Sequence, residues 1–462
     1  MEKPKLTALS WWNTERTIIN YRAFSNILIP SWLKCSRNGG HDRVLPTTYL
    51  DGFRGVVAFL VFLRHFSLPW NPNVDYGLGQ GIRSLSFQQL PLIRILFSGP
   101  NVPVFLVVSG YVMSIKPLRM IHGDRKENLL ETMISSIFRR AVRLFTPPLI
   151  SSFLVMISVR LDMFSFPYEE MPGHIPHHPQ TMPNFPSQLI DWMQFVFKDL
   201  TVPWTWRAQP SIYGNHLWTT PLQFRCSMVL FLVIIGLASC RRRVRQSILA
   251  VIFLYCFCFG RWDVALYLSG MFMAEHDMEL QEASVRLLST GNSSSESFSS
   301  KKTSGLKLQI LWGLVLFAGC YLSSFPRAWD GVDSPYGYKC LFIVTANYRY
   351  WHSIAAVMLI WCLSNSKAAQ RPFTTSLARY LGKISFSVYI VHEPLLHTVG
   401  FRVVKLAWNL TGQATSFQYG LGFGIAFSFT SLVLLWVADV FHRAVDEPSA
   451  NLARWLEKKC QN

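Results

Sequence analysis

The sequence predicts an all-α protein, a polytopic bundle of about ten transmembrane helices. Half of the 462 residues are hydrophobic and only 15% are charged, whereas a soluble chain carries about a quarter charged residues. The mean hydropathy is positive, at +0.23. The hydrophobic residues also gather in blocks, and crossing a bilayer takes roughly 20 residues of apolar helix.

The expected spans follow one another from residue 49 to residue 441. In chain order they are 49–68, 100–115, 144–163, 217–239, 247–260, 262–275, 308–325, 350–364, 384–401 and 418–441. The spans 247–260 and 262–275 are short and are separated only by Arg261-Trp262-Asp263. No cleavable leader precedes the first span, because residues 1–48 are polar and basic. We therefore expect the first span to act as its own insertion signal.

The basic residues predict the orientation of the bundle. The chain carries a formal charge of +18. The segments on one side of the predicted bundle hold roughly three times as many lysines and arginines as the loops on the opposite side, and such an excess is typical of the cytosolic side. Both termini are then cytosolic, with a basic segment at 1–48, a transmembrane domain at 49–441 and a tail at 442–462. Charge confined to short loops argues against nucleic-acid binding. It suits contact with the lipid bilayer or a polyanionic cofactor.

Two long loops interrupt the pattern. The non-cytosolic loop at about 164–216 is rich in proline, which excludes a long regular helix, so we expect a folded cap over the bundle. The cytosolic loop at about 276–306 contains a serine-rich stretch, Ser289–Ser304, typical of flexible segments. Asn409-Leu410-Thr411 is a glycosylation sequon on the non-cytosolic side, so Asn409 is an expected glycosylation site.

Neither the cysteines nor the histidine cluster predicts a metal site. The nine cysteines are scattered and form no disulfide or zinc framework. His174, His177 and His178 lie close in the sequence, but no carboxylate or thiolate is placed to complete a site. We therefore expect no bound metal.

The first span carries two groups suited to chemistry. Arg54 and His65 are eleven residues apart, or about three helical turns, so they share one face about 16 Å apart along the axis. Ionisable groups inside a span are functional candidates, and a neutral histidine can take a proton from a hydroxyl. The alternative is a histidine that only hydrogen-bonds a neighbouring helix. The arginine on the same face favours a catalytic role for His65.

Two further polar groups open later spans. Arg139, Arg140 and Arg143 lie at the cytosolic start of the third span, where arginine forks can grip phosphates or simply mark the cytosolic side. Gln223 and Arg225 fall in the first turns of the fourth span. There they can bond across helices, for packing as readily as for catalysis.

With these residues in place, the sequence resembles acyltransferase family 3 of membrane O-acyltransferases, especially its fungal branch. The matching segments are LDGFRGVVAFLVFLRHF (50–66), PVFLVVSGYVMS (103–114), FRRAVRLFTPP (138–148), LWTTPLQFRCSMV (217–229), SFSVYIVHEPLL (385–396) and FHRAVDEPSANLARWL (441–456). Each is weak alone, but the six occur in family order over nearly the whole chain.

The resemblance implies transfer of an acyl group, usually acetyl from acetyl-CoA as co-substrate, with no resident cofactor. It makes His65 the essential base with Arg54 beside it, and it assigns donor binding to Arg140 and Arg143, with Arg139 next to them. Candidate supports for the acceptor are Gln223, Trp218, Arg225 and His392. Gln223 stands where the family often has an acidic residue, so its expected role is to orient a partner or the substrate by hydrogen bonding.

The function expected from the sequence is therefore O-acylation of a small lipophilic alcohol, such as a terpenoid or polyketide of secondary metabolism. A cell-wall or secreted glycan is the alternative acceptor. The rival class is a transporter or lipid-translocating protein, for which Arg54 and His65 would only line a path. We expect the protein to reside in an internal membrane, the endoplasmic reticulum, because no other targeting signal is recognised in the sequence.

Overall fold

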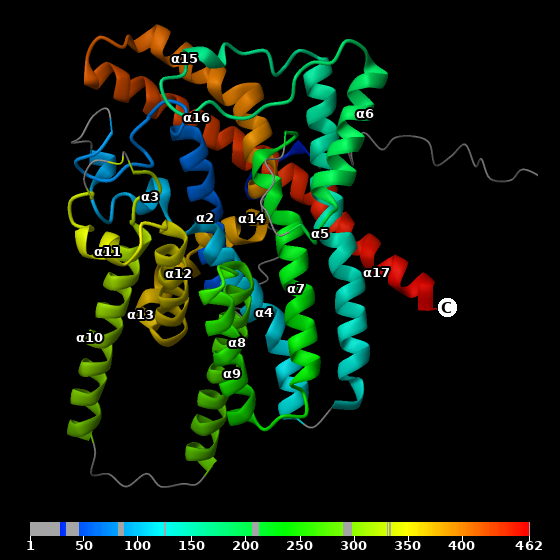
Figure 1. Ribbon diagram of the computed structural model, residues 1–462, viewed down its shortest axis with the longest axis vertical. Coiled ribbons are helices and arrows are strands. Elements are labelled where there is room, and N and C mark those ends of the chain that lie inside the picture. The colour runs from blue at the N-terminus through cyan, green and yellow to red at the C-terminus, as the bar shows by residue number, and fades with distance from the viewer. Residues whose placement is uncertain are drawn as a thin grey trace, which may run out of the picture.

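The protein is a bundle of long helices. The computed structural model describes residues 28–33, 46–81, 87–123, 126–205, 212–289, 298–329, 331 and 334–461, and all regular elements in these ranges are helical, which confirms the all-α class. The longest helices are α2 (Thr48–Ser67), α4 (Asn101–His122), α5 (Leu129–Arg160), α7 (Thr219–Gly236), α8 (Arg242–Cys258), α9 (Trp262–Ser289), α10 (Phe298–Ser323), α12 (Tyr348–Asn365), α14 (Ser376–Leu395), α16 (Ser416–Phe441) and α17 (Glu447–Gln461) (Figure 1).

Every expected span overlaps one of these helices. In the described part of the chain, four helices are long and apolar enough to cross a membrane: Asn101–His122, Leu129–Arg160, Asn215–Gly236 and Ser416–Cys460. A shorter apolar helix covers Lys307–Ser323. The presence of membrane-spanning helices thus agrees with the sequence, while ten crossings and the cytosolic placement of both termini stay predictions.

The loop expected at 276–306 is shorter in the structure than the sequence predicts. Helix α9 continues to Ser289, so it includes the first part of the segment expected to be a flexible loop at 276–306, and α10 begins at Phe298. Most of the serine-rich stretch, residues 290–297, lies outside the described residues. The described part of 164–216 contains only short helical pieces, of which α6 (Phe185–Phe195) is the longest. The Asn184 side chain caps α6 by accepting from the Ser187 amide.

Glycines bring α2 and α14 into backbone contact. A Cβ added at Gly55 would lie 2.3 Å from the Gly382 nitrogen, and one at Gly382 would lie 2.5 Å from the Asp51 carbonyl oxygen. Small residues permit such close approach between apolar helices. The contact holds Arg54 of α2 directly against α14.

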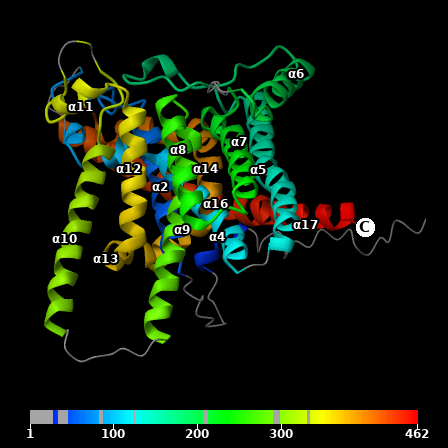
Figure 2. The same ribbon diagram turned by 60° about the horizontal axis from the view of Figure 1, so that its bottom comes forward.

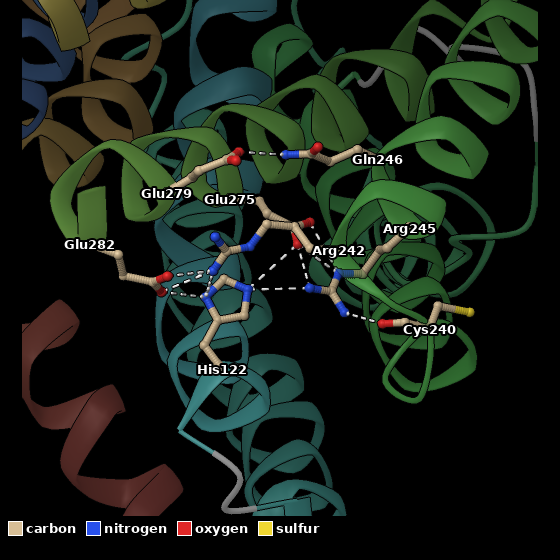
Figure 3. Close-up of polar contacts among 8 residues, drawn as sticks. All are labelled: His122, Cys240, Arg242, Arg245, Gln246, Glu275, Glu279 and Glu282. Atoms are coloured by element: carbon tan, nitrogen blue, oxygen red, sulfur yellow. Dashed lines mark hydrogen bonds and ion pairs between the residues drawn. The ribbon is translucent and has the colours of Figure 1, made fainter. Parts of the chain in front are cut away.

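An ion-pair cluster ties α4 to α8 and α9 (Figure 3). The fully buried Arg245 of α8 pairs with Glu275 of α9, and Arg242 Nη2 donates to both carboxylate oxygens of Glu282 at 2.9 Å. His122 at the end of α4 lies between them, with its ring nitrogens 3.5 Å from Glu275 and 3.4 Å from Glu282. Removal of one partner would leave a buried charge unpaired, so this cluster fixes the relative position of the three helices.

Helix α17 leaves the bundle sideways. It follows α16 through a π-helical turn, His442–Asp446. It packs along α5, and its C-terminal end projects away from the main bundle (Figure 2). Ala453 of this helix is buried, whereas Leu452 and Trp455 are exposed.

Another ion pair anchors the loop that follows α2. Arg64 Nη1 and Nη2 donate to Asp75 Oδ1 at 2.5 Å and Oδ2 at 3.0 Å, respectively. Burial would raise the pKa of the Asp75 carboxyl, but the Arg64 guanidinium outweighs burial and holds that pKa well below its usual range.

We expect Asp75→Asn to lower stability by on the order of 2–3 kcal/mol, because Arg64 would keep a largely buried, unpaired charge. A depressed pKa contributes stability above the unfolded value and loses it as pH falls through the folded one. The difference in thermal midpoint between wild type and variant, measured in detergent, should therefore stay constant between about pH 5 and 8 and shrink below about pH 4. Equal midpoints at pH 7 would contradict this assignment.

Candidate active site

A polar cavity opens between α2, α4, α5, α7, α14 and the turn before α17. Its volume is about 320 Å³. The charged and polar lining residues are Arg54, Ser109, Arg140, Arg143, Thr219, Gln223, Lys383, Ser385, Tyr389, His442 and Asp446, and the apolar ones include Val102, Phe105, Val108, Val112, Met113, Leu144 and Phe386. The cavity thus has a cationic wall and an apolar wall.

Of the arginines Arg139, Arg140 and Arg143 of α5, two line this cavity. Arg140 is held by Ser227 and by the hydroxyl of Tyr267, each with a donor–acceptor distance of 3.3 Å. Arg143 also lines the cavity. Arg139 does not: its Nε lies 3.4 Å from Glu457 of α17. One residue along a helix turns the side chain by about 100°, which places Arg139 on a different face from Arg140.

Arg54 is oriented by α14. Its Nε donates to Ser385 Oγ at 2.9 Å, and its Nη2 donates to the Gly382 carbonyl at 3.2 Å. Asp51, one turn earlier on α2, lies 3.4 Å from the same Nη2. Arg54 therefore keeps its charge at the cavity wall beside Arg140 and Arg143.

His65 lies near the other end of α2 and also faces α14. Its Nδ1 is 3.2 Å from His392 Nε2, and His392 Nδ1 is 2.7 Å from the Tyr389 carbonyl. A carbonyl only accepts, so His392 Nδ1 carries the proton and His392 Nε2 accepts. When both rings are neutral, His65 then donates from Nδ1, and the lone pair of its Nε2 is free to take a proton.

A second buried pair supports His392. His216 and Glu393 are paired through Nδ1 and Oε2, and the His216 amide also donates to Oε2 at 3.0 Å. His216 Nε2 lies 3.1 Å from the Ile390 carbonyl and therefore carries a proton. The rings of His216 and His392 are 4.7 Å apart between centroids. This pair fixes the turn of α14 that holds His392.

Tyr389 closes the cavity on the side of the histidines. Its hydroxyl lies 2.7 Å from Thr219 Oγ1 and donates to the His216 carbonyl at 2.7 Å. Tyr389 and Thr219 both line the cavity, whereas His65 and His392 are not among its lining residues. His65 therefore lies outside the cavity that the arginines line.

The other residues chosen from the sequence have different surroundings. Gln223 lines the cavity, while Trp218 packs, partly buried, against the apolar core. Arg225 pairs with Asp263 at 2.7 Å and donates to two backbone carbonyls, which is a structural role away from the cavity. Asn409 is exposed on α15 (Phe401–Thr411). Among the described residues, no group of three or more His, Cys, Asp and Glu side chains is arranged to hold a metal ion.

Several site residues were not singled out from the sequence. They are Lys383, Ser385, Tyr389 and Glu393 of α14, His216 before α7, and His442 and Asp446 before α17. Positions 385, 389, 392 and 393 share one helical face. Polar residues at this helical spacing within an apolar span could have indicated these site residues from the sequence. Only His392 was selected in this way.

The comparisons with known proteins identify the family of the chain. The family model described as an acyltransferase domain (Acyl_transf_3) matches residues 47–439, and the chain therefore belongs to acyltransferase family 3. This family consists of membrane-associated acyltransferases, so acyl transfer is the class of activity that the family and its relatives support.

Three fungal proteins are similar along most of their length. The chain is 31% identical to O-acetyltransferase PaAT-1 of Phomopsis amygdali, over 94% of this chain and 88% of that protein. It is 24% identical to acyltransferase R4 of a Phoma species and 25% identical to acyltransferase clz18 of Cochliobolus lunatus, in both cases over 87% of this chain and 94% of the relative. No solved structure matches the chain.

Proposed function

We propose that the protein is an O-acetyltransferase that moves an acetyl group from acetyl-CoA to the hydroxyl of a small lipophilic acceptor. The observation that carries the proposal is the pairing of two features: a cavity wall of four cationic side chains from α2, α5 and α14, and the histidine His65 of α2, whose Nδ1 bonds to His392 of α14. A cationic pocket fits the phosphates of coenzyme A. A neutral histidine fits proton abstraction from an alcohol.

The separation of the two features fits the length of the donor. Arg54 and His65 are about 16 Å apart along α2. The arm between phosphorus and sulfur in coenzyme A has about thirteen chain atoms, the length of about four extended residues, or ~15 Å. Phosphates at Arg140 and Arg143 would thus allow the thioester to reach His65 once Tyr389 moves aside.

The reaction needs one base near the thioester. His65 Nε2 takes the proton of the acceptor hydroxyl while the oxygen bonds to the acetyl carbon. The carbon–sulfur bond then breaks, and the leaving thiolate receives the proton from His65. The hydrogen bond that His65 Nδ1 donates to His392 keeps the ring in the tautomer that this transfer requires.

The chemical class of the acceptor is inferred from the relatives and from the residues that line the cavity. The O-acetyltransferase name of the Phomopsis relative favours transfer to a hydroxyl group. The apolar wall of the cavity favours a lipophilic alcohol, such as a terpenoid or polyketide of secondary metabolism. Acylation of a glycan is the second candidate. Acetyl-CoA would enter from the cytosol, with the enzyme in the endoplasmic reticulum.

The decisive experiment measures free thiol released from acetyl-CoA by the purified protein in detergent. We expect release that depends on an added lipophilic alcohol, with an acetyl ester of equal amount as product. A transporter or lipid-translocating protein would leave acetyl-CoA intact with every alcohol offered, and that result would exclude the proposed activity. Parallel assays with oligosaccharides separate the two acceptor classes.

A further inference from the structure

The cavity contains one carboxylate among cations. Of its lining residues Arg54, Arg140, Arg143 and Lys383 are basic, and Asp446 is the acidic one. A cavity built only to bind phosphates gains nothing from a carboxylate, since the negative charge repels the ligand. Asp446 therefore requires an explanation of its own.

The position of Asp446 depends on the π-helical turn His442–Asp446 between α16 and α17. Such wide turns are frequent at functional sites. The turn places His442 and Asp446 side by side in the cavity wall, and His442 Nδ1 donates to Asp446 Oδ2 at 2.9 Å. The imidazole thus fixes the orientation of the carboxylate.

The second oxygen of this carboxylate is unused. The Asp446 side chain is only 7% exposed, and its Oδ1 has no hydrogen-bond partner among the residues that the structure describes. Leaving a buried polar atom without a partner is unfavourable. A ligand group that donates a hydrogen bond to Oδ1 would remove this disadvantage.

The chemistry of the donor limits what that group can be. Phosphate oxygens cannot donate when ionised, so they suit the arginines and not Asp446. The nucleoside attached to the phosphates carries donors, namely a ribose hydroxyl and the adenine amino group. Carboxylates recognise ribose hydroxyls in other nucleotide-binding folds.

We propose that Asp446, oriented by His442, accepts a hydrogen bond from the adenosine part of the acyl donor. The cavity then binds both parts of a nucleotide: Arg140 and Arg143 bind the phosphates, and Asp446 binds the nucleoside. This inference rests on the proposed function for the identity of the donor. It adds a recognition site that selects a nucleotide thioester over a simple acyl thioester or a bare phosphate.

The test is binding of two probes to the purified full-length protein by calorimetry: adenosine 3′,5′-bisphosphate, and inorganic pyrophosphate. In Asp446→Asn, the side chain can keep the bond from His442 and present an amide N–H in place of the free oxygen. We expect the bisphosphate to bind about tenfold more weakly or worse, in line with loss of a hydrogen bond to a charged group. Pyrophosphate should bind equally well or more tightly, because a repulsive charge has gone.

A change in bisphosphate affinity opposite to the expected one would overturn the inference. If Asp446 only offsets the arginines, Asp446→Asn binds both probes more tightly, or binds both unchanged. Glu131→Gln is the control, because this exposed carboxylate in the first turn of α5 does not line the cavity, and the binding of both probes by this variant should equal that of wild type. His442→Gln should weaken bisphosphate binding in the same direction, which guards against a fold defect specific to Asp446→Asn.

The same variants separate this inference from the proposed function. In turnover assays, Asp446→Asn should raise the KM for acetyl-CoA and leave that for S-acetylpantetheine, which lacks the nucleotide, unchanged. An equal rise for both donors would contradict recognition of the adenosine. Bisphosphate binding that depends on Asp446, together with absent acetyl transfer, would instead refute the proposed function and keep the nucleotide site.

Discussion

His65→Ala should reduce the rate of acetyl transfer by about 10²–10⁴-fold, the range that a positioned general base contributes. The loss should fall on kcat, because His65 lies behind Tyr389 and outside the cavity that holds the donor. The Asp446-dependent binding of adenosine 3′,5′-bisphosphate should therefore stay at the wild-type level. Thiol release with saturating acetyl-CoA and alcohol is the measurement.

The controls for this prediction are two other histidines. His276→Ala, on α9 and outside the cavity lining, should keep full activity. His392→Gln keeps a hydrogen-bond acceptor for His65 Nδ1 and should retain more activity than His392→Ala, which removes it. A folded His65→Ala protein with wild-type kcat would refute the assignment of His65 as the base.

Replacing both Arg140 and Arg143 by Gln should lower kcat/KM for acetyl-CoA by about 10²–10⁴-fold, since each hydrogen bond to a charged group contributes about 1.5–3 kcal/mol. The loss should appear mainly as a higher KM. It should be small with S-acetylpantetheine, which carries no phosphate for these arginines to hold. Kinetics with the two donors, measured side by side, provide the test.

Arg139→Gln is the matched control, because Arg139 lies one residue from Arg140 but pairs with Glu457 outside the cavity. Its KM for acetyl-CoA should remain within about twofold of wild type, as expected for loss of an exposed ion pair. An Arg139 effect as large as that of the double variant would mean that the arginines act through the overall charge of this face and not through the cavity.

The helices could be predicted from the sequence because apolar blocks are a local property of the chain. The expected span 49–68 corresponds to α2, Thr48–Ser67. The flexible loop expected at 276–306 shows the limit of such patterns. Polar helix turns resemble a loop when only hydropathy is considered. Helix α9 nevertheless continues to Ser289, and Arg242 of α8 supplies a partner for Glu282 within this extension.

The site was predictable only where one helix carries the pattern. Arg54 and His65 share a face of α2 by spacing alone, and the structure places both against α14. The pairing of Arg139 with Glu457 depends on where α17 packs, and the pairing of His216 with Glu393 joins residues 177 positions apart. Contacts of this kind depend on tertiary packing, which no single helical pattern contains.

The glycine contact between α2 and α14 determines which part of the enzyme can open. Arg54, His65, Ser385 and His392 all belong to these two helices, whose main chains touch without intervening side chains. Such a pair cannot slide or tilt apart without losing its packing, so it behaves as a stationary frame for the reacting groups. We therefore expect a ligand that reaches His65 to be admitted by movement of the Tyr389 ring or of α7, which carries Thr219, and not by separation of α2 from α14.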